Sequence, residues 1–330
     1  MQVLIYERAY ARLERELATI PGVQPVLMGD DGSLSMNGAP ISPEAAAPVV
    51  AWANTDLYVS GPVREFMVLC LKSKTLRFLQ SSAAGFEHPV FSLLVDKGIT
   101  LANSDASAIS IAEFVLARVL GELQPNAQRN MLQMEKRWER TPFREISGQT
   151  WLVIGMGNIG REVTLRARAF GARVIGVRRT VRGDEPCDRT ITLDAIDGEI
   201  PSCDVIVLAA PSNPQSRHVI NATRLARMKP TSILVNIARG ALIDEAALSA
   251  SLERGTPGCA ILDVFETEPL PEESPLWFHP RVRVTAHNAA NSDGFITRND
   301  QLFLRNLARF AAGQAPERVV DAATVKASQA

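Results

Sequence analysis

Apolar and polar residues alternate in blocks along this chain, and the lengths of the apolar blocks separate strands from helices. In the first hundred residues we expect strands at 2–6, 56–60 and 76–80 and a helix near 62–72. A further helix is expected to begin at Ser42-Pro43-Glu44, where serine can cap the helix and proline fits its first turn. Pro48 should shorten that helix. Strands that alternate with helices predict a small parallel sheet.

A long apolar helix is predicted next, from Ser104-Asp105 toward residue 135, and it suits either a link between two domains or a subunit contact. The alternation then resumes. Strands are expected at 150–154, 172–177, 204–208, 232–236, 259–262 and 282–285. Helices are expected at 221–228, 244–254 and 292–311, with Asn221 and Asp244 as N-caps of the first two. The last helix should return to pack on the N-terminal domain, which would make that domain discontinuous.

A glycine-rich turn joins the strand at 150–154 to the helix that follows it. Its glycines have the spacing GxGxxG, which allows a tight turn, the approach of a pyrophosphate to the backbone, and close packing of helix on strand. The N–H groups at the start of the helix attract phosphate. We therefore expect this turn to bind a dinucleotide through Gly155, Met156, Gly157, Asn158, Ile159 and Gly160. The helix should bury Ile159, Val163, Ala167 and Phe170 and stop at Gly171.

Composition narrows the class of protein. The 330 residues are too many for one ordinary core and favour two domains. The formal charge of −1 and the absence of an apolar run of about 18 residues give no indication of a nucleic-acid or membrane partner. The N-terminal residues lack the basic segment of a signal peptide, and the four scattered cysteines have no metal-binding spacing. We expect a cytoplasmic protein with reduced thiols and no metal site.

The residues after the strand at 172–177 indicate which dinucleotide is bound. In NAD-specific sites an acidic residue roughly 20 residues beyond the glycines binds the ribose hydroxyl. Here Arg178 and Arg179 hold that position, with Arg182 close by. Because a guanidinium pairs with a phosphate that a carboxylate would repel, we predict NADP(H) as the preferred cofactor, with NAD(H) possible. The alternative is that these arginines are ordinary solvated charges.

Three ionisable residues, Arg239, Glu268 and His287, follow predicted strands in the second half of the chain. Ligands bind at the carboxyl ends of strands in such sheets, so we expect the three to meet at the nicotinamide. Together they suit hydride transfer to the carbonyl of a 2-keto acid. Arg239 would bind the substrate carboxylate and polarise the carbonyl, His287 would protonate its oxygen, and Glu268 would favour the charged imidazole. Taken singly, each also fits an ordinary loop charge or a structural histidine.

These motifs resemble the D-isomer-specific 2-hydroxyacid dehydrogenases. The resemblance rests on GxGxxG, NxARGxxxDExAL, LDVFExEPL and the late histidine, and it is strong over about 148–287. It implies that Arg239, Glu268 and His287 are the catalytic residues. It also implies that Asp263 binds the nicotinamide carboxamide, that Pro211 and Ala238 line the cofactor, and that Ala84 and Gly85 bind substrate together with Arg239 and His287. The Arg178-Arg179 pair is similar to the NADP-dependent glyoxylate/hydroxypyruvate reductase branch.

The resemblance also implies an architecture and an assembly. We expect an α/β protein of two Rossmann-like domains with parallel sheets, a substrate cleft between them, and a homodimer. The substrate-binding domain is expected at 1–104 and 288–330, and the dinucleotide-binding domain at 105–287. The partner is then a small 2-keto or 2-hydroxy acid.

Two positions depart from the family pattern. Ala286 stands where the family often has proline before the histidine, and Asn288 replaces the usual isoleucine or valine after it. Both leave the acid–base role intact, but they leave the substrate open between glyoxylate or hydroxypyruvate and a bulkier 2-hydroxy acid. Formate dehydrogenase is disfavoured because that enzyme carries glutamine in place of Glu268. A dinucleotide-sensing binding protein remains a third interpretation, and the intact Arg–Glu–His set argues against it.

Overall fold

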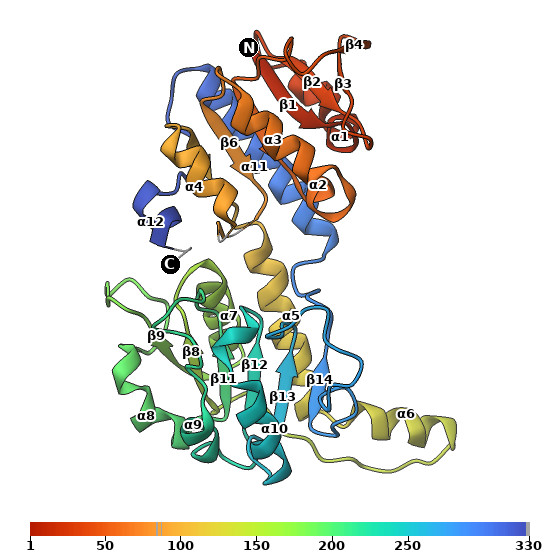
Figure 1. The fold of residues 1–330 in the computed structure, drawn as a ribbon. Helices are drawn as coiled ribbons and strands as arrows, with labels where there is room; N and C mark the ends of the chain where they lie inside the picture. The colour runs from red at the N-terminus through yellow and green to blue at the C-terminus, as the bar shows by residue number, and fades with distance from the viewer. Residues whose placement is uncertain (84, 87, 328–330) are drawn as a thin grey trace. The chain divides into compact units, whose positions relative to one another are not determined.

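The computed structural model describes residues 1–83, 85, 86 and 88–327, and the chain forms two compact units (Figure 1). The first unit contains residues 1–106 and 292–330, and the second contains residues 107–291. Each unit is built around one seven-stranded sheet, which confirms the α/β prediction. Helix α11 (Asp293–Ala311) belongs to the first unit, so the N-terminal part of the fold is discontinuous, as predicted.

In the first unit, parallel strands form most of the sheet and a hairpin extends one edge. The strand order is β4-β3-β2-β1-β5-β6-β7. The parallel strands are β1 (Gln2–Tyr6), β2 (Gln24–Met28), β5 (Val50–Ala53), β6 (Phe78–Ser81) and β7 (Thr100–Ala102). The antiparallel hairpin at the edge is formed by β3 (Leu34–Met36) and β4 (Ala39–Ile41).

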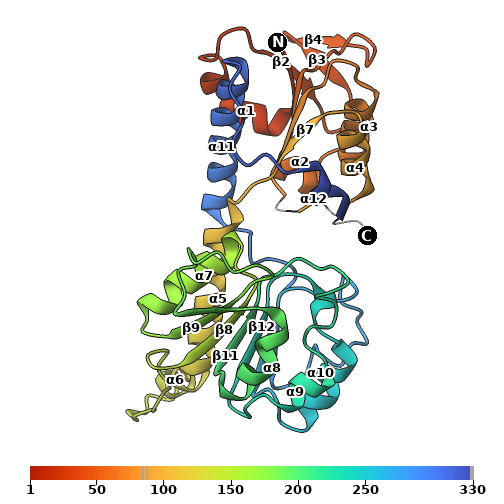
Figure 2. The same ribbon diagram turned by 90° about the vertical axis from the view of Figure 1, so that its left-hand side faces the viewer.

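Helices cover both faces of this sheet (Figure 2). Helices α1 (Glu7–Leu17) and α11 pack on one face, where Trp52 of β5 stacks on Phe303 of α11 with ring centroids 4.2 Å apart. The other face is covered by α2 (Thr55–Ser60), α3 (Val63–Lys72), α4 (Pro89–Asp96) and α12 (Ala322–Ala327). Apolar side chains of these helices therefore pack against the two faces of the sheet.

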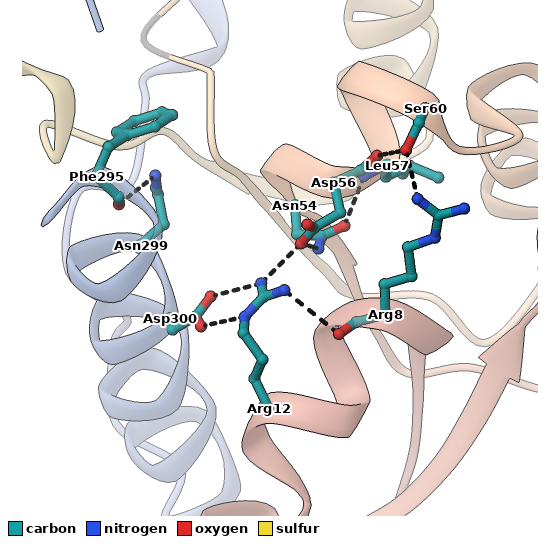
Figure 3. A network of polar contacts seen from close by, with 9 residues as sticks. All are labelled: Arg8, Arg12, Asn54, Asp56, Leu57, Ser60, Phe295, Asn299 and Asp300. Atoms are coloured by element: carbon teal, nitrogen blue, oxygen red, sulfur yellow. Dashed lines mark hydrogen bonds and ion pairs between the residues drawn. The ribbon is translucent and has the colours of Figure 1, made fainter. Parts of the chain in front are cut away.

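A polar network binds α11 to residues far away in the sequence (Figure 3). The Arg12 guanidinium on α1 donates to Asp56 Oδ2 at 2.7 Å and to Asp300 Oδ2 of α11 at 3.1 Å. Asn54 Nδ2 donates to the same Asp56 oxygen at 2.9 Å. Burial raises the pKa of Asp300, and Arg12 opposes that rise. One guanidinium thus pairs with carboxylates from two helices and holds the C-terminal helix in the first unit.

Two predictions for this unit were wrong. Residues 43–45 form a turn instead of a helix start, and Val50–Ala53 forms a fully buried strand between β1 and β6. Residues 56–60 form helix instead of strand, because the Asn54 side chain accepts a hydrogen bond from the Leu57 N–H at 3.2 Å and caps α2. At residues 50–53 the position of the segment in the sheet outweighs the local helix signal, whereas at residues 56–60 a local cap decides the structure.

The second unit has an all-parallel sheet with strand order β10-β9-β8-β11-β12-β13-β14. Its strands are β8 (Thr150–Ile154), β9 (Arg173–Val177), β10 (Arg189–Ile191), β11 (Val205–Leu208), β12 (Ile233–Asn236), β13 (Cys259–Leu262) and β14 (Val282–Val284). All the strands predicted here are confirmed, and β10 was not predicted. The order of strands reverses between β8 and β11, and ligands of such sheets bind at the carboxyl ends of the strands at that point.

Helices cover both faces of this sheet as well. Helices α5 (Ser107–Leu123) and α7 (Asn158–Ala169) pack on one face, and α8 (Ile196–Glu199), α9 (Ala222–Ala226) and α10 (Glu245–Glu253) pack on the other. The side chains of Asn221 and Asp244 cap α9 and α10, as predicted. Short 3-10 turns lie at Leu193–Ala195, Ile200–Ser202 and Gly240–Leu242.

The single long helix predicted toward residue 135 is wrong. Helix α5 ends at Leu123, and a separate helix α6 (Asn126–Met134) begins after Pro125, which cannot continue a helix. The inward face of α7 is confirmed at Val163 and Ala167, but Phe170 follows the helix and is half exposed. Gly171 ends that helix with φ +83°, as predicted. The four cysteines are free thiols. None of the helices within residues 1–83 and 88–327 is long and apolar enough to cross a membrane.

Candidate active site

The glycine turn after β8 is shaped by backbone contacts that leave no room for two side chains. A Cβ on Gly155, whose φ is +106°, would lie 2.5 Å from the Ala209 carbonyl carbon after β11. A Cβ on Gly160 would lie 1.9 Å from the Gly155 carbonyl oxygen. Gly157 is different, because a Cβ there would meet nothing within 4 Å, and this residue is the N-cap of α7. The space above Gly157 and the first N–H groups of α7 therefore fit a pyrophosphate.

Arg178, which follows β9, contacts a carboxylate that the sequence interpretation did not identify. Arg178 Nη1 lies 3.2 Å from Glu185 Oε1, and the Glu185 side chain is almost fully buried. Glu185 also accepts hydrogen bonds from the backbone N–H groups of Arg182 at 3.0 Å and Gly183 at 2.9 Å. Burial alone would raise the pKa of Glu185, but these donors and Arg178 hold it below its ordinary value. Arg179 is exposed at the same strand end.

Arg239 follows β12 in a tightly bonded turn. The Asn236 side chain donates to the Arg239 carbonyl at 2.9 Å and accepts from the Ala238 N–H at 3.1 Å. A Cβ on Gly240 would lie 1.9 Å from the Phe265 carbonyl carbon, so the turn after β12 touches the segment after β13. Arg239 is half-buried, and its Nη1 donates to the Ala238 carbonyl at 2.7 Å. The turn thus holds Arg239 next to the segment that carries Glu268.

His287 and Glu268 form an ion pair at the carboxyl ends of β13 and β14. His287 Nδ1 lies 2.9 Å from Glu268 Oε2, and both side chains are partly exposed. The other Glu268 oxygen accepts from the Phe265 N–H at 3.0 Å. Glu268 is therefore fixed by its own backbone and holds one imidazole nitrogen, so Nε2 is the nitrogen that can deliver a proton to a ligand. The structure brings these two predicted residues together.

Asp263 accepts several hydrogen bonds that the sequence does not indicate. Its side chain is buried, with 1% exposed, and it accepts from the Thr285 hydroxyl at 2.6 Å, the Asn288 N–H at 2.8 Å and the Ala289 N–H at 2.9 Å. The Asp263 carbonyl accepts from the His287 N–H at 2.8 Å. Sequence reasoning missed these contacts, because backbone donors leave no pattern in the sequence. Its role toward a nicotinamide carboxamide stays a prediction.

A second histidine–glutamate pair lies at the same edge and was also missed. His218 Nε2 lies 2.7 Å from Glu266 Oε1, and the Glu266 N–H donates to Glu245 Oε1 at 2.6 Å. Burial raises the pKa of Glu245, and the nearby charges of Glu266 and Glu268 add to the rise. The sequence signals for this cluster were Glu245 in the DExAL motif and Glu266 in the LDVFExEPL motif. Because the charge of Glu268 acts on Glu245, this cluster lies close to the His287–Glu268 pair.

The remaining predicted residues are placed as follows. Pro211 and Ala238 follow β11 and β12, on the strand ends next to the glycine turn. Gly85 is half-buried in the first unit, and Ala84 lies outside the described residues. Their predicted roles in substrate binding stay predictions. In the described part of the chain, no three His, Cys, Asp or Glu side chains gather to hold a metal ion.

Comparison with known proteins identifies the family to which this chain is similar. Residues 116–289 match the model of the D-isomer specific 2-hydroxyacid dehydrogenase, NAD binding domain. D-3-phosphoglycerate dehydrogenase of Methanocaldococcus jannaschii is 33% identical over 254 residues, which cover 76% of this chain and 48% of that protein. Glyoxylate reductase of Korarchaeum cryptofilum is 28% identical over 258 residues, covering 76% and 78%. This chain therefore spans about half the length of the first of these relatives.

A solved structure adds a comparison over almost the whole chain. The D-isomer specific 2-hydroxyacid dehydrogenase from Xanthobacter autotrophicus Py2, in complex with NADPH and MES, is 26% identical. It has a TM-score of 0.74, and the match covers 98% of both chains. The fold and the motifs thus point to the same group of proteins.

Proposed function

The chain belongs to the D-isomer-specific 2-hydroxyacid dehydrogenase family, and on that premise we propose that it is an NADPH-dependent reductase of a small 2-keto acid. Membership makes it an enzyme, an NAD(P)-binding oxidoreductase. The proposed substrates resemble glyoxylate or hydroxypyruvate, and the product is a D-2-hydroxy acid. The observation that carries the proposal is the 2.9 Å contact between His287 Nδ1 and Glu268 Oε2 at the strand edge next to the Arg239 turn.

In this mechanism the side chains bind the substrate and move one proton. Bound NADPH supplies the hydride. Arg239 binds the carboxylate of the 2-keto acid and draws electron density toward the carbonyl oxygen, because its guanidinium is a permanent cation with forked donors. His287 gives its Nε2 proton to that oxygen as the carbonyl carbon is reduced. Glu268 keeps the imidazole oriented, since one of its oxygens is fixed by the Phe265 N–H.

The test is a panel of 2-keto acids assayed at 340 nm with NADPH and with NADH. We expect oxidation of NADPH with small 2-keto acids and a loss in kcat of roughly 10²- to 10⁴-fold for His287→Gln, the range for removal of a general acid. His279→Gln is the matched control, because His279 precedes the amino-terminal end of β14 whereas His287 follows its carboxyl-terminal end. Full activity of His287→Gln would reject the proposed acid, and inactivity of the wild type with every keto acid would favour a dinucleotide sensor.

The preference for NADPH is proposed from the arginines after β9. A 2′-phosphate would meet Arg179 and would share Arg178 with Glu185. The NADPH complex of the Xanthobacter relative is consistent with this reading. We expect Arg178→Ala to weaken binding of 2′,5′-ADP about tenfold, the order expected for one lost charge-assisted contact, and to leave 5′-AMP unchanged. Arg173→Ala, at the opposite end of β9, is the control. Equal losses for both ligands would contradict the assignment.

A homodimer is proposed from exposed apolar side chains on α6 and the segment after it. Met131, Met134, Trp138 and Phe143 are each at least half exposed. The four residues are close together in the sequence, and a contiguous exposed apolar patch is typical of a protein interface. Light scattering should give about twice the chain mass of 35.9 kDa for the wild type and a lower mass for Trp138→Arg. A wild-type mass of one chain would overturn the proposal.

A further inference from the structure

The backbone around His287 adopts a conformation that needs support. His287 has φ +52°, in the left-handed region, which is unfavourable for a residue with a side chain unless its surroundings hold it. The turn that carries it runs from Thr285 to Ala289. In that turn residue 286 is alanine, so the chain lacks the proline that would itself restrict the backbone before the histidine. Other contacts must therefore fix the turn.

Those contacts converge on Asp263. Four donors of the turn bond to this one residue, whose side chain is 1% exposed: the Thr285 hydroxyl and the N–H groups of His287, Asn288 and Ala289. Two consecutive N–H groups, at 288 and 289, bond to the two different oxygens of the carboxylate. Asp263 is in turn tied to the neighbouring strand, since its N–H donates to the Asn236 carbonyl at 3.0 Å.

We propose that Asp263 is the positioning residue for His287, acting as a buried clamp that holds the left-handed turn so that the imidazole meets Glu268. A carboxylate suits this task because it only accepts, and a bidentate arrangement fixes two successive N–H groups at once. A carboxylate offers about four acceptor positions, and three are used by the turn. The inference rests on the proposed role of His287 as the proton donor.

Asp263→Asn separates this role from binding of the nicotinamide carboxamide. Asparagine has the same shape, but its amide N–H would face a backbone N–H of the turn, so one clamp contact is lost. We expect kcat to fall about 10- to 100-fold, the order of loss for a reacting group misplaced by roughly 1 Å. We expect the Kd values of NADPH and of 2′,5′-ADP, which has no nicotinamide, to stay within about threefold, because the Asp263 carboxylate is buried and occupied by donors of the turn.

The environment of the His287 imidazole can be measured by NMR, without an activity assay. The chain has four histidines, so spectra of selectively ¹³C-histidine-labelled protein contain few signals, and His287→Gln identifies one of them. In Asp263→Asn we expect the His287 signal to shift or broaden while the signals of His88, His218 and His279 remain. Thr285→Val removes one donor of the clamp without changing side-chain shape, and we expect a loss in kcat of only about threefold. This variant carries the test if Asp263→Asn does not fold.

The outcomes are distinguishable. A raised Kd for NADPH with an unchanged Kd for 2′,5′-ADP, and an unmoved His287 signal, would overturn the clamp and assign Asp263 to the carboxamide. A His287 signal that moves in Asp263→Asn confirms the clamp, whatever the catalytic role of the histidine. Full activity of His287→Gln would reject the proposed function alone.

Discussion

The glycine turn allows one residue to be changed so that cofactor binding and folding respond separately. Gly157 has φ −77° and ψ −163°, values that alanine adopts without strain, and a Cβ there meets nothing within 4 Å. Replacing glycine with alanine costs up to about 1 kcal/mol at an N-cap. The less flexible unfolded chain offsets this by about 0.4–1 kcal/mol. Gly157→Ala should therefore fold normally, with Tm changed by a few degrees at most.

Cofactor binding should respond strongly to the same change. The new methyl group occupies the space in which a pyrophosphate would approach the first N–H groups of α7. Loss of one or two charge-assisted hydrogen bonds, at about 1.5–3 kcal/mol each, corresponds to a Kd for NADPH raised roughly 10-fold or more. The assay is equilibrium binding of NADPH followed by nicotinamide fluorescence, with thermal unfolding of the same samples.

Two further glycines serve as controls. Gly160→Ala would place a Cβ 1.9 Å from the Gly155 carbonyl oxygen, so the turn must deform and the protein should be severely destabilised. Gly121→Ala lies in α5 with open space around it and should gain about 0.5–1 kcal/mol without altering NADPH binding. If Gly157→Ala binds NADPH as the wild type does, the pyrophosphate does not lie over this turn and the reasoning is refuted.

Two other predictions concern the buried charges and thiols. Arg12→Met should destabilise the protein by about 1–3 kcal/mol at pH 7, because Asp300 is left buried without its cation. The pKa of Asp300 is raised by burial, so its protonated form favours the folded state, and the loss measured by urea unfolding should shrink as pH falls toward 4; a loss that grows on acidification would contradict this. Burial raises the pKa of Cys203 to about 11 and of Cys259 to about 12, and it raises that of Cys70 still further. At pH 8 a thiol reagent should therefore label only the half-buried Cys187 in native protein and all four thiols in denaturant; rapid native labelling of a second thiol would contradict the burial.

The sequence predicts the second unit better than the first, for a physical reason. Parallel strands covered on both faces appear as short continuous apolar runs, and β8, β11, β12 and β13 all have that pattern. In the first unit, Val50–Ala53 is equally buried, but it follows a serine–proline helix signal that the sheet overrides. The short hairpin of β3 and β4 gives a weak signal, and neither it nor the amphipathic helix α1 was predicted.

The site likewise contains residues that the sequence predicts and residues that it does not. Arg239, Glu268 and His287 are recognisable because their ionisable side chains follow apolar strands within a few residues. The partners that hold the site are not, because they act on backbone groups. Glu185 bonds to the N–H groups of residues 182 and 183, and Asp263 bonds to those of residues 288 and 289. Such contacts depend on turn geometry, which no spacing of side chains specifies.

The hydrogen bonds of four carboxylates at this edge bear on the proposed binding of an anionic keto acid. Glu245 accepts from the Glu266 N–H, Glu266 pairs with His218, Glu268 holds His287, and Asp263 is saturated by its turn. Each of these carboxylates thus has a hydrogen-bond donor within the protein. Each would therefore repel the carboxylate of a substrate less strongly than an unpaired carboxylate would. The guanidinium of Arg239 would then supply the permanent positive charge that the carboxylate of the proposed substrate meets. His218→Ala should accordingly raise the KM for the keto acid, because Glu266 would lose the imidazole that it contacts at 2.7 Å; an unchanged KM would contradict this explanation.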